Sequence, residues 1–68
     1  MPTVNSSLVR FIEYFPEEQI LRVVFVSGSA YLYMGVPESV YTAFLHSSSK
    51  GQFFNNRIRD RYPSQKVR

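Results

Sequence analysis

The sequence predicts a small α+β domain, in which a three-stranded antiparallel β meander is followed by two helices packed on one face of the sheet. Apolar residues recur with a period of two up to residue 34 and with a period of about 3.6 after residue 35, which indicates strands followed by helices. A length of 68 residues allows one hydrophobic core, and an aromatic content of 16% is typical of a packed chain. We therefore expect residues 1–68 to form one domain, with flexible ends at 1–6 and 64–68.

The first half of the chain predicts three strands joined by short turns. Residues 8–15 mix apolar with charged positions and are followed by a proline, so a half-buried strand is expected to end where a hairpin turn at 16–19 begins. Residues 20–26 are rich in β-branched side chains and predict the clearest strand. After a turn that contains Gly28, residues 30–34 are expected to pair back as the third strand.

Tyr31 and Tyr33 share one face of the third strand, and the length of the preceding turn decides which face that is. A two-residue turn at 28–29 places the two rings on the face opposite to Phe25. A three-residue loop at 27–29 places Tyr31 directly across from Phe25, on the face that the helices cover. On an open face the rings form a stacking platform for unpaired bases. Aromatic rings in strands are most often packed, which favours the covered face.

The first helix is expected over residues 37–46. Pro37 supplies the fixed backbone angle that the first helical position prefers. Residues at helical spacing then form one stripe that is expected to face the core. This stripe comprises Val36, Val40, Ala43, Phe44 and Ser47.

The second helix is expected to begin after Ser49 and to end near Tyr62. Ser49 and Gln52 have the spacing of a capping box, which satisfies free backbone N–H groups at a helix start. Phe54, Ile58 and Tyr62 recur every four residues and therefore share a face. A proline follows Tyr62 and cannot continue the helix.

Basic residues gather in the C-terminal third of the chain. Up to residue 40 there are two basic and four acidic residues, whereas from residue 41 onward there are six basic residues and a single acid, Asp60. Phosphate groups are expected to approach this third, although a solvated helix edge has the same sequence pattern. The candidate nucleic-acid-binding residues are Tyr31, Tyr33, Arg57, Arg59, Arg61 and Lys66.

The composition gives no support to catalysis. The chain has no cysteine, one aspartate and one histidine, His46, so neither a nucleophilic triad nor a metal site can be assembled. We expect no cofactor, no bound metal and no enzymatic activity. The longest apolar run is far shorter than the roughly 18 residues of a membrane span, and the chain does not begin like a secretory signal. A cytoplasmic protein that does not enter the membrane is expected.

The order and spacing of many residues together form a recognisable pattern. These residues are Ser6, Ser7, Tyr14, Leu21, Val23, Phe25, Gly28, Tyr31, Tyr33, Val36, Pro37, Val40, Tyr41, Ser49, Gly51, Phe53, Phe54, Asn55, Ile58, Arg59 and Tyr62. In this pattern the chain resembles the KTSC domain family, which occurs alone in bacterial proteins and at the C-terminus of some lysyl-tRNA synthetases. It differs from the usual family pattern at Phe15, where a polar residue is common. The resemblance implies RNA binding, which has been suggested for the family, and brings no catalytic residues.

Two functional hypotheses follow. The first is an RNA-binding accessory module that uses the basic residues for phosphates and the tyrosines for bases. The second is a module that binds a protein partner or a second copy of itself through an apolar sheet face or an unpaired strand edge. Binding that falls with salt favours the first, and association that resists salt favours the second. The sequence leaves the ligand and the oligomeric state open.

Overall fold

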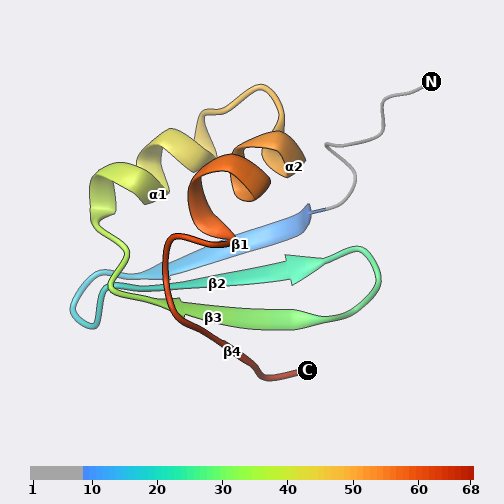
Figure 1. Ribbon diagram of the computed structural model, residues 1–68, viewed down its shortest axis with the longest axis horizontal. Helices are drawn as coiled ribbons and strands as arrows, with labels where there is room; N and C mark the ends of the chain where they lie inside the picture. The colour runs from blue at the N-terminus through green and yellow to red at the C-terminus, as the bar shows by residue number, and fades with distance from the viewer. Residues whose placement is uncertain (1–8) are drawn as a thin grey trace.

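The computed structural model describes residues 9–68 as a four-stranded antiparallel sheet with two helices on one face (Figure 1). The expected N-terminal arm at 1–6 and the expected strand start at Leu8 lie outside the described residues. The strands follow one another across the sheet in chain order. The elements are β1 (Val9–Phe15), β2 (Ile20–Phe25), β3 (Ala30–Met34), α1 (Glu38–Leu45), α2 (Lys50–Phe53), its π-helical continuation η2 (Phe54–Ile58) and β4 (Ser64–Lys66).

The β1–β2 hairpin confirms the predicted turn. β1 ends at Phe15, which pairs with Ile20 at the start of β2, so the four residues between them form the turn. Gln19 closes it with a φ of 56°, in the left-handed region that few non-glycine residues enter. The carbonyl of Gln19 accepts a hydrogen bond of 2.9 Å from the N–H of Val36, which ties this turn to the start of the helical half.

The β2–β3 connection places the tyrosines on the covered face. Tyr31 pairs with Val23 and Tyr33 pairs with Leu21. The predicted loop at 27–29, with Tyr31 opposite Phe25, is wrong, because Phe25 lies opposite Ser29 and the three residues between these two are 26–28. The odd number of residues still places the tyrosines on the predicted face. The N–H of Phe25 donates to the carbonyl of Ser29 at 2.8 Å, which ends β2 one residue earlier than predicted. The alternative that puts the rings on the open face is therefore wrong.

The prediction of three strands is corrected to four. Residues 64–66, expected as part of a flexible end, form β4 and pair with β3, with Lys66 opposite Tyr31. The chain that leaves η2 crosses the sheet to reach this position (Figure 1). The segment is polar and exposed, and it pairs through its backbone, so hydrophobic periodicity gives no signal for it.

The second helix is shorter than predicted and contains a π turn. The side chain of Ser49 accepts a hydrogen bond from the N–H of Gln52 at 3.3 Å, as its capping position requires. After α2 the N–H of Arg59 donates to the carbonyl of Phe54 at 2.9 Å, a bond that spans five residues instead of four. η2 then ends at Ile58, and a turn replaces the last helical turn expected up to Tyr62.

The core lies between the helices and one face of the sheet. Phe44 of α1 stacks on Phe53 of α2, with ring centroids 5.2 Å apart. Tyr14 of β1 stacks on Tyr41 of α1, and its hydroxyl donates to a carbonyl that follows β3. Ala43, expected in the core stripe, is exposed. The buried apolar residues are Val9, Leu21, Val23, Ala30, Tyr33, Val36, Phe44, Phe54 and Ile58.

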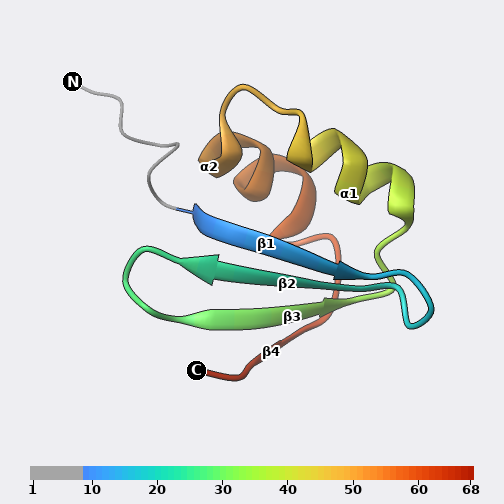
Figure 2. The same cartoon turned by 180° about the vertical axis from the view of Figure 1, so that it is seen from behind.

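The second face of the sheet is partly open to solvent, as predicted. Figure 2 shows this side, with no helix in front of the strands. Phe11 is 48% exposed and Phe15 is 37% exposed on this face. Arg22 forms an ion pair of 2.9 Å with Glu13 there, and its guanidinium lies 6.0 Å from the centroid of the Phe11 ring. We call this surface the outer face.

Candidate functional site

The helices leave part of the covered face open, where a groove of about 430 Å³ lies between the β2–β3 end of the sheet and the residues around η2. The volume falls within the range of about 300–1,000 Å³ that is common for small-ligand sites. We call it the aromatic groove. It is lined by Phe25, Ser27, Ser29, Tyr31, Tyr33, Phe54, Arg59, Asp60 and Ser64.

Four packed rings line the aromatic groove. The rings of Tyr31 and Tyr33 lie 6.3 Å apart with an interplanar angle of 29°, as alternate residues on one strand face. Phe25 meets Tyr31 edge-on at 5.8 Å, and Phe54 meets Tyr33 edge-on at 5.6 Å. Tyr33 and Phe54 are buried, whereas Tyr31 and Phe25 are only half-buried. The half-buried rings therefore offer a surface that the buried rings hold in place.

One cation and one anion follow each other directly at the groove. Arg59 and Asp60 lie in the turn after η2, and both are exposed while lining the groove. The π turn contains one residue more than an α turn and so changes the direction in which these side chains leave the helix. The Nη1 atom of Arg59 lies 3.5 Å from Oδ1 of Asn55, one turn earlier.

Both of these charges affect the pKa of the Tyr33 hydroxyl. The pKa of Tyr33 is raised to about 12, with burial as the largest cause and the neighbouring Tyr31 as the second. Arg59 lowers the pKa of Tyr33, and Asp60 raises it. The phenol therefore stays protonated and neutral at physiological pH, where it can donate a hydrogen bond.

Tyr33 is expected to make the domain less stable as the pH rises in the alkaline range. Its folded-state pKa lies above the ordinary value of 10.0, so its contribution is fully present below pH 10 and is lost as pH rises through about 12. Wild-type protein is expected to lose about 2 kcal/mol more of its unfolding free energy over that interval than Tyr33→Phe, which has no phenol to ionise. Urea unfolding at a series of pH values measures this difference, and parallel losses in the two proteins would contradict it.

The structure brings four of the six predicted site residues together. Tyr31, Tyr33 and Arg59 line the aromatic groove. Lys66 lies opposite Tyr31 on β4, and because paired residues of antiparallel strands point to the same face, it lies on the covered side next to that ring. Arg61 is exposed and does not line this groove. It also does not line the second hollow, to which Arg57 belongs.

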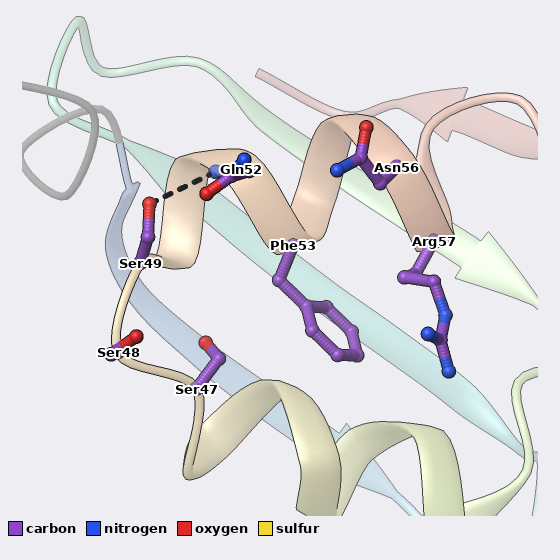
Figure 3. A pocket seen from close by; sticks show the side chains of 7 residues that line it. All are labelled: Ser47, Ser48, Ser49, Gln52, Phe53, Asn56 and Arg57. Atoms are coloured by element: carbon purple, nitrogen blue, oxygen red, sulfur yellow. Dashed lines mark hydrogen bonds between the residues drawn. The ribbon is translucent and has the colours of Figure 1, made fainter.

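Arg57 belongs to a separate hollow of about 250 Å³ between the α1–α2 loop and the second helix (Figure 3). Its guanidinium lies 5.5 Å from the centroid of the Phe53 ring, within the range of a cation–π contact. Figure 3 shows the two side chains next to each other. Figure 3 shows the Ser47 side chain on the side of this ring, whereas the Ser49 hydroxyl points to the N–H of Gln52. The lining residues are Ser47, Ser48, Ser49, Gln52, Phe53, Asn56 and Arg57.

Six residues that line the aromatic groove were not predicted as site residues: Phe25, Ser27, Ser29, Phe54, Asp60 and Ser64. Phe25 and Phe54 were assigned to strand and helix faces that pack, and each of them does pack while one side borders the groove. Asp60 was counted only as the single acid of a basic segment. The contrast between this acid and the basic residues around it was the one feature of the sequence that marked Asp60.

Two features are absent from the part of the chain that the structure describes. Within residues 9–68, no helix is long and apolar enough to cross a membrane. In the same residues, no group of three or more histidine, cysteine, aspartate or glutamate side chains is arranged to hold a metal ion.

Comparisons with known proteins give consistent matches. The sequence profile of the KTSC domain matches residues 5–62. A protein from Tsukamurella paurometabola is 39% identical over 62 residues, which cover 91% of this chain and 92% of that protein. A lysine-tRNA ligase from Nostoc punctiforme is 34% identical over 63 residues, which cover 93% of this chain but only 11% of the ligase.

A solved structure agrees with the fold. The crystal structure of a KTSC domain protein from Yersinia pestis superposes with a TM-score of 0.86 at 34% sequence identity. The match covers 98% of this chain and 94% of that protein. The sheet and both helices therefore have a counterpart in an experimental structure.

Proposed function

The chain belongs to the KTSC domain family, and from this membership we propose that it is an RNA-binding accessory module whose aromatic groove holds an unpaired base. The observation that carries the proposal is the half-buried Tyr31 ring with Arg59 and Lys66 around it. The match to a segment of a lysine-tRNA ligase, a protein that acts on an RNA, supports this class of ligand.

The shape of the aromatic groove favours a single base over a duplex. A duplex hides the faces of its bases in the stack, whereas unpaired bases stack readily on aromatic side chains. Tyr31 and Phe25 meet edge-on, so a base that lies on one ring contacts the edge of the other. Two buried rings, Tyr33 and Phe54, support them from behind. The groove is thereby set up before the ligand arrives, which lowers the ordering cost of binding.

The surrounding charges favour a phosphate backbone. Arg59 is at the groove, Lys66 lies next to Tyr31, and Arg61 follows within the same turn. Each phosphate that these cations neutralise adds to affinity and makes it fall with salt, by a slope of about 0.7 per contact for a single strand. Such contacts position the RNA without reading its sequence.

Replacing Tyr31 with leucine tests the stacking surface. Leucine keeps apolar volume against Phe25 but removes the aromatic face, so affinity for single-stranded RNA is expected to fall roughly 5- to 150-fold, the equivalent of about 1–3 kcal/mol per stacked base. Fluorescence anisotropy with a labelled oligonucleotide, at low and at physiological salt, measures the loss. Phe15→Leu is the matched control, because it removes an exposed aromatic ring from the outer face. If circular dichroism shows that both variants are folded and their affinities for the RNA are equal, the proposal is contradicted.

The outer face favours a second candidate function, a protein-interaction module. Phe11 and Phe15 expose apolar rings on a sheet surface that the helices do not cover. Association that depends on protein concentration and resists salt, measured by sedimentation, supports this candidate. It is compatible with RNA binding, because the two surfaces lie on opposite sides of the sheet.

A further inference from the structure

Asp60 is an unexpected residue at a groove that we propose to bind RNA. It is the single acid among the residues from 41 onward, and its side chain lines the aromatic groove. Within residues 9–68 the structure contains one ion pair, between Arg22 and Glu13, so Asp60 is not neutralised there by a cation. A free carboxylate repels phosphates, and the part of a bound nucleotide that faces it must therefore carry hydrogen-bond donors.

Only the bases offer such donors in a fixed plane, and they differ in their arrangement. The Watson–Crick edge of guanine presents the acceptor O6, then the donors N1–H and N2–H₂. Adenine and cytosine present one donor next to an acceptor, and uracil presents one donor between two acceptors. A carboxylate accepts two parallel N–H groups, as it does from a guanidinium. Guanine alone has two adjacent donors for it, with an acceptor beside them.

The two residues at the groove supply the complementary pattern. Arg59 has donors only, Asp60 in its ionised form has acceptors only, and they are neighbours in the same turn. Arginine commonly donates to O6 of guanine. Resting on the proposed function, we infer that the aromatic groove prefers guanine, which stacks on Tyr31 while Asp60 accepts from N1–H and N2–H₂ and Arg59 donates to O6.

The test compares single-stranded RNA oligonucleotides that are uridine throughout except for one central position, which is G, inosine, A, C or U. Anisotropy at constant salt is expected to show tighter binding of the G oligonucleotide, by roughly 5- to 150-fold over A, C and U. Inosine lacks only the N2 amino group, so the inosine oligonucleotide is expected to lie between them.

Asp60→Asn separates base recognition from charge. Removing a negative charge strengthens binding of every RNA if Asp60 acts only through the overall field. Loss of the bidentate acceptor instead weakens G binding relative to A, so the preference for G is expected to fall at least about 5-fold. Glu18→Gln is the matched control, because it removes the same charge from the exposed β1–β2 turn and should keep the preference.

The outcomes distinguish the inference from the proposed function on which it rests. Equal affinities for all five oligonucleotides, together with a loss of binding in Tyr31→Leu, overturn the guanine preference and leave RNA binding in place. An unchanged preference in Asp60→Asn also overturns the inference. Failure of the wild-type protein to bind any of these oligonucleotides overturns both. A G preference that weakens with inosine and with Asp60→Asn supports the inference.

Discussion

Replacing Phe44 with alanine is expected to lower the free energy of unfolding by about 3–5 kcal/mol, the usual cost of removing a buried phenylalanine. Phe44 is 0% exposed and is the buried residue of α1. Its ring lies nearly parallel to Phe53, at an angle of 11° and a centroid distance of 5.2 Å, so it connects the two helices. Truncation leaves a cavity that neither helix can close without moving.

This loss is large compared with the total stability of so small a domain. A chain of 68 residues has an expected unfolding free energy of roughly 3–10 kcal/mol, and it contains no cysteine that could form a disulfide to compensate. Urea unfolding followed by circular dichroism measures the difference. Leu45→Ala is the matched control, because the neighbouring side chain in the same helix is 43% exposed and is expected to cost less than about 1 kcal/mol. Similar losses in the two variants would contradict the central role of Phe44.

The sequence predicted those parts of the fold that hydrophobic patterns and turn residues control. The turn at 16–19, the strand at 30–34 and the cap at Ser49 are found as predicted, because each depends on local chemistry that a few residues contain. To predict the face of the sheet on which the tyrosine rings lie, one further fact was required: whether the β2–β3 connection has an odd or an even number of residues. That parity depends on which residue enters the left-handed region, and Gly28, with a φ of 100°, does so.

Other parts could not be predicted because they depend on partners distant in the sequence. The pairing of residues 64–66 depends on the free edge of β3, and their side chains are polar and exposed, so no apolar period marks them. The π turn at η2 has no composition of its own and shortens the helix before Tyr62. Both features build the aromatic groove, and the role of Asp60 therefore becomes visible only in three dimensions.

Replacing Gln65 with proline is expected to detach β4 from the sheet. Gln65 pairs with Leu32. Two residues before Gln65, the carbonyl of Pro63 accepts a hydrogen bond of 2.9 Å from β3. Two residues after Gln65, the N–H of Val67 donates a hydrogen bond of 2.8 Å to β3. Alternation by two residues directs the N–H of Gln65 toward β3 as well, and proline has no such group. The expected cost of about 1–3 kcal/mol is comparable to what a three-residue edge strand contributes.

Detachment of β4 is expected to weaken RNA binding as well, because Ser64 and Lys66 leave the tyrosine rings that they oppose. Loss of one phosphate contact lowers the slope of log affinity against log salt by about 0.7. Anisotropy titrations at four salt concentrations measure both quantities for Gln65→Pro and for its control Gln65→Ala, which keeps the backbone N–H. Lys66→Gln then separates the two causes, since it removes the charge while β4 stays paired. If Gln65→Pro binds as tightly as Gln65→Ala and keeps its slope, β4 lies outside the binding surface.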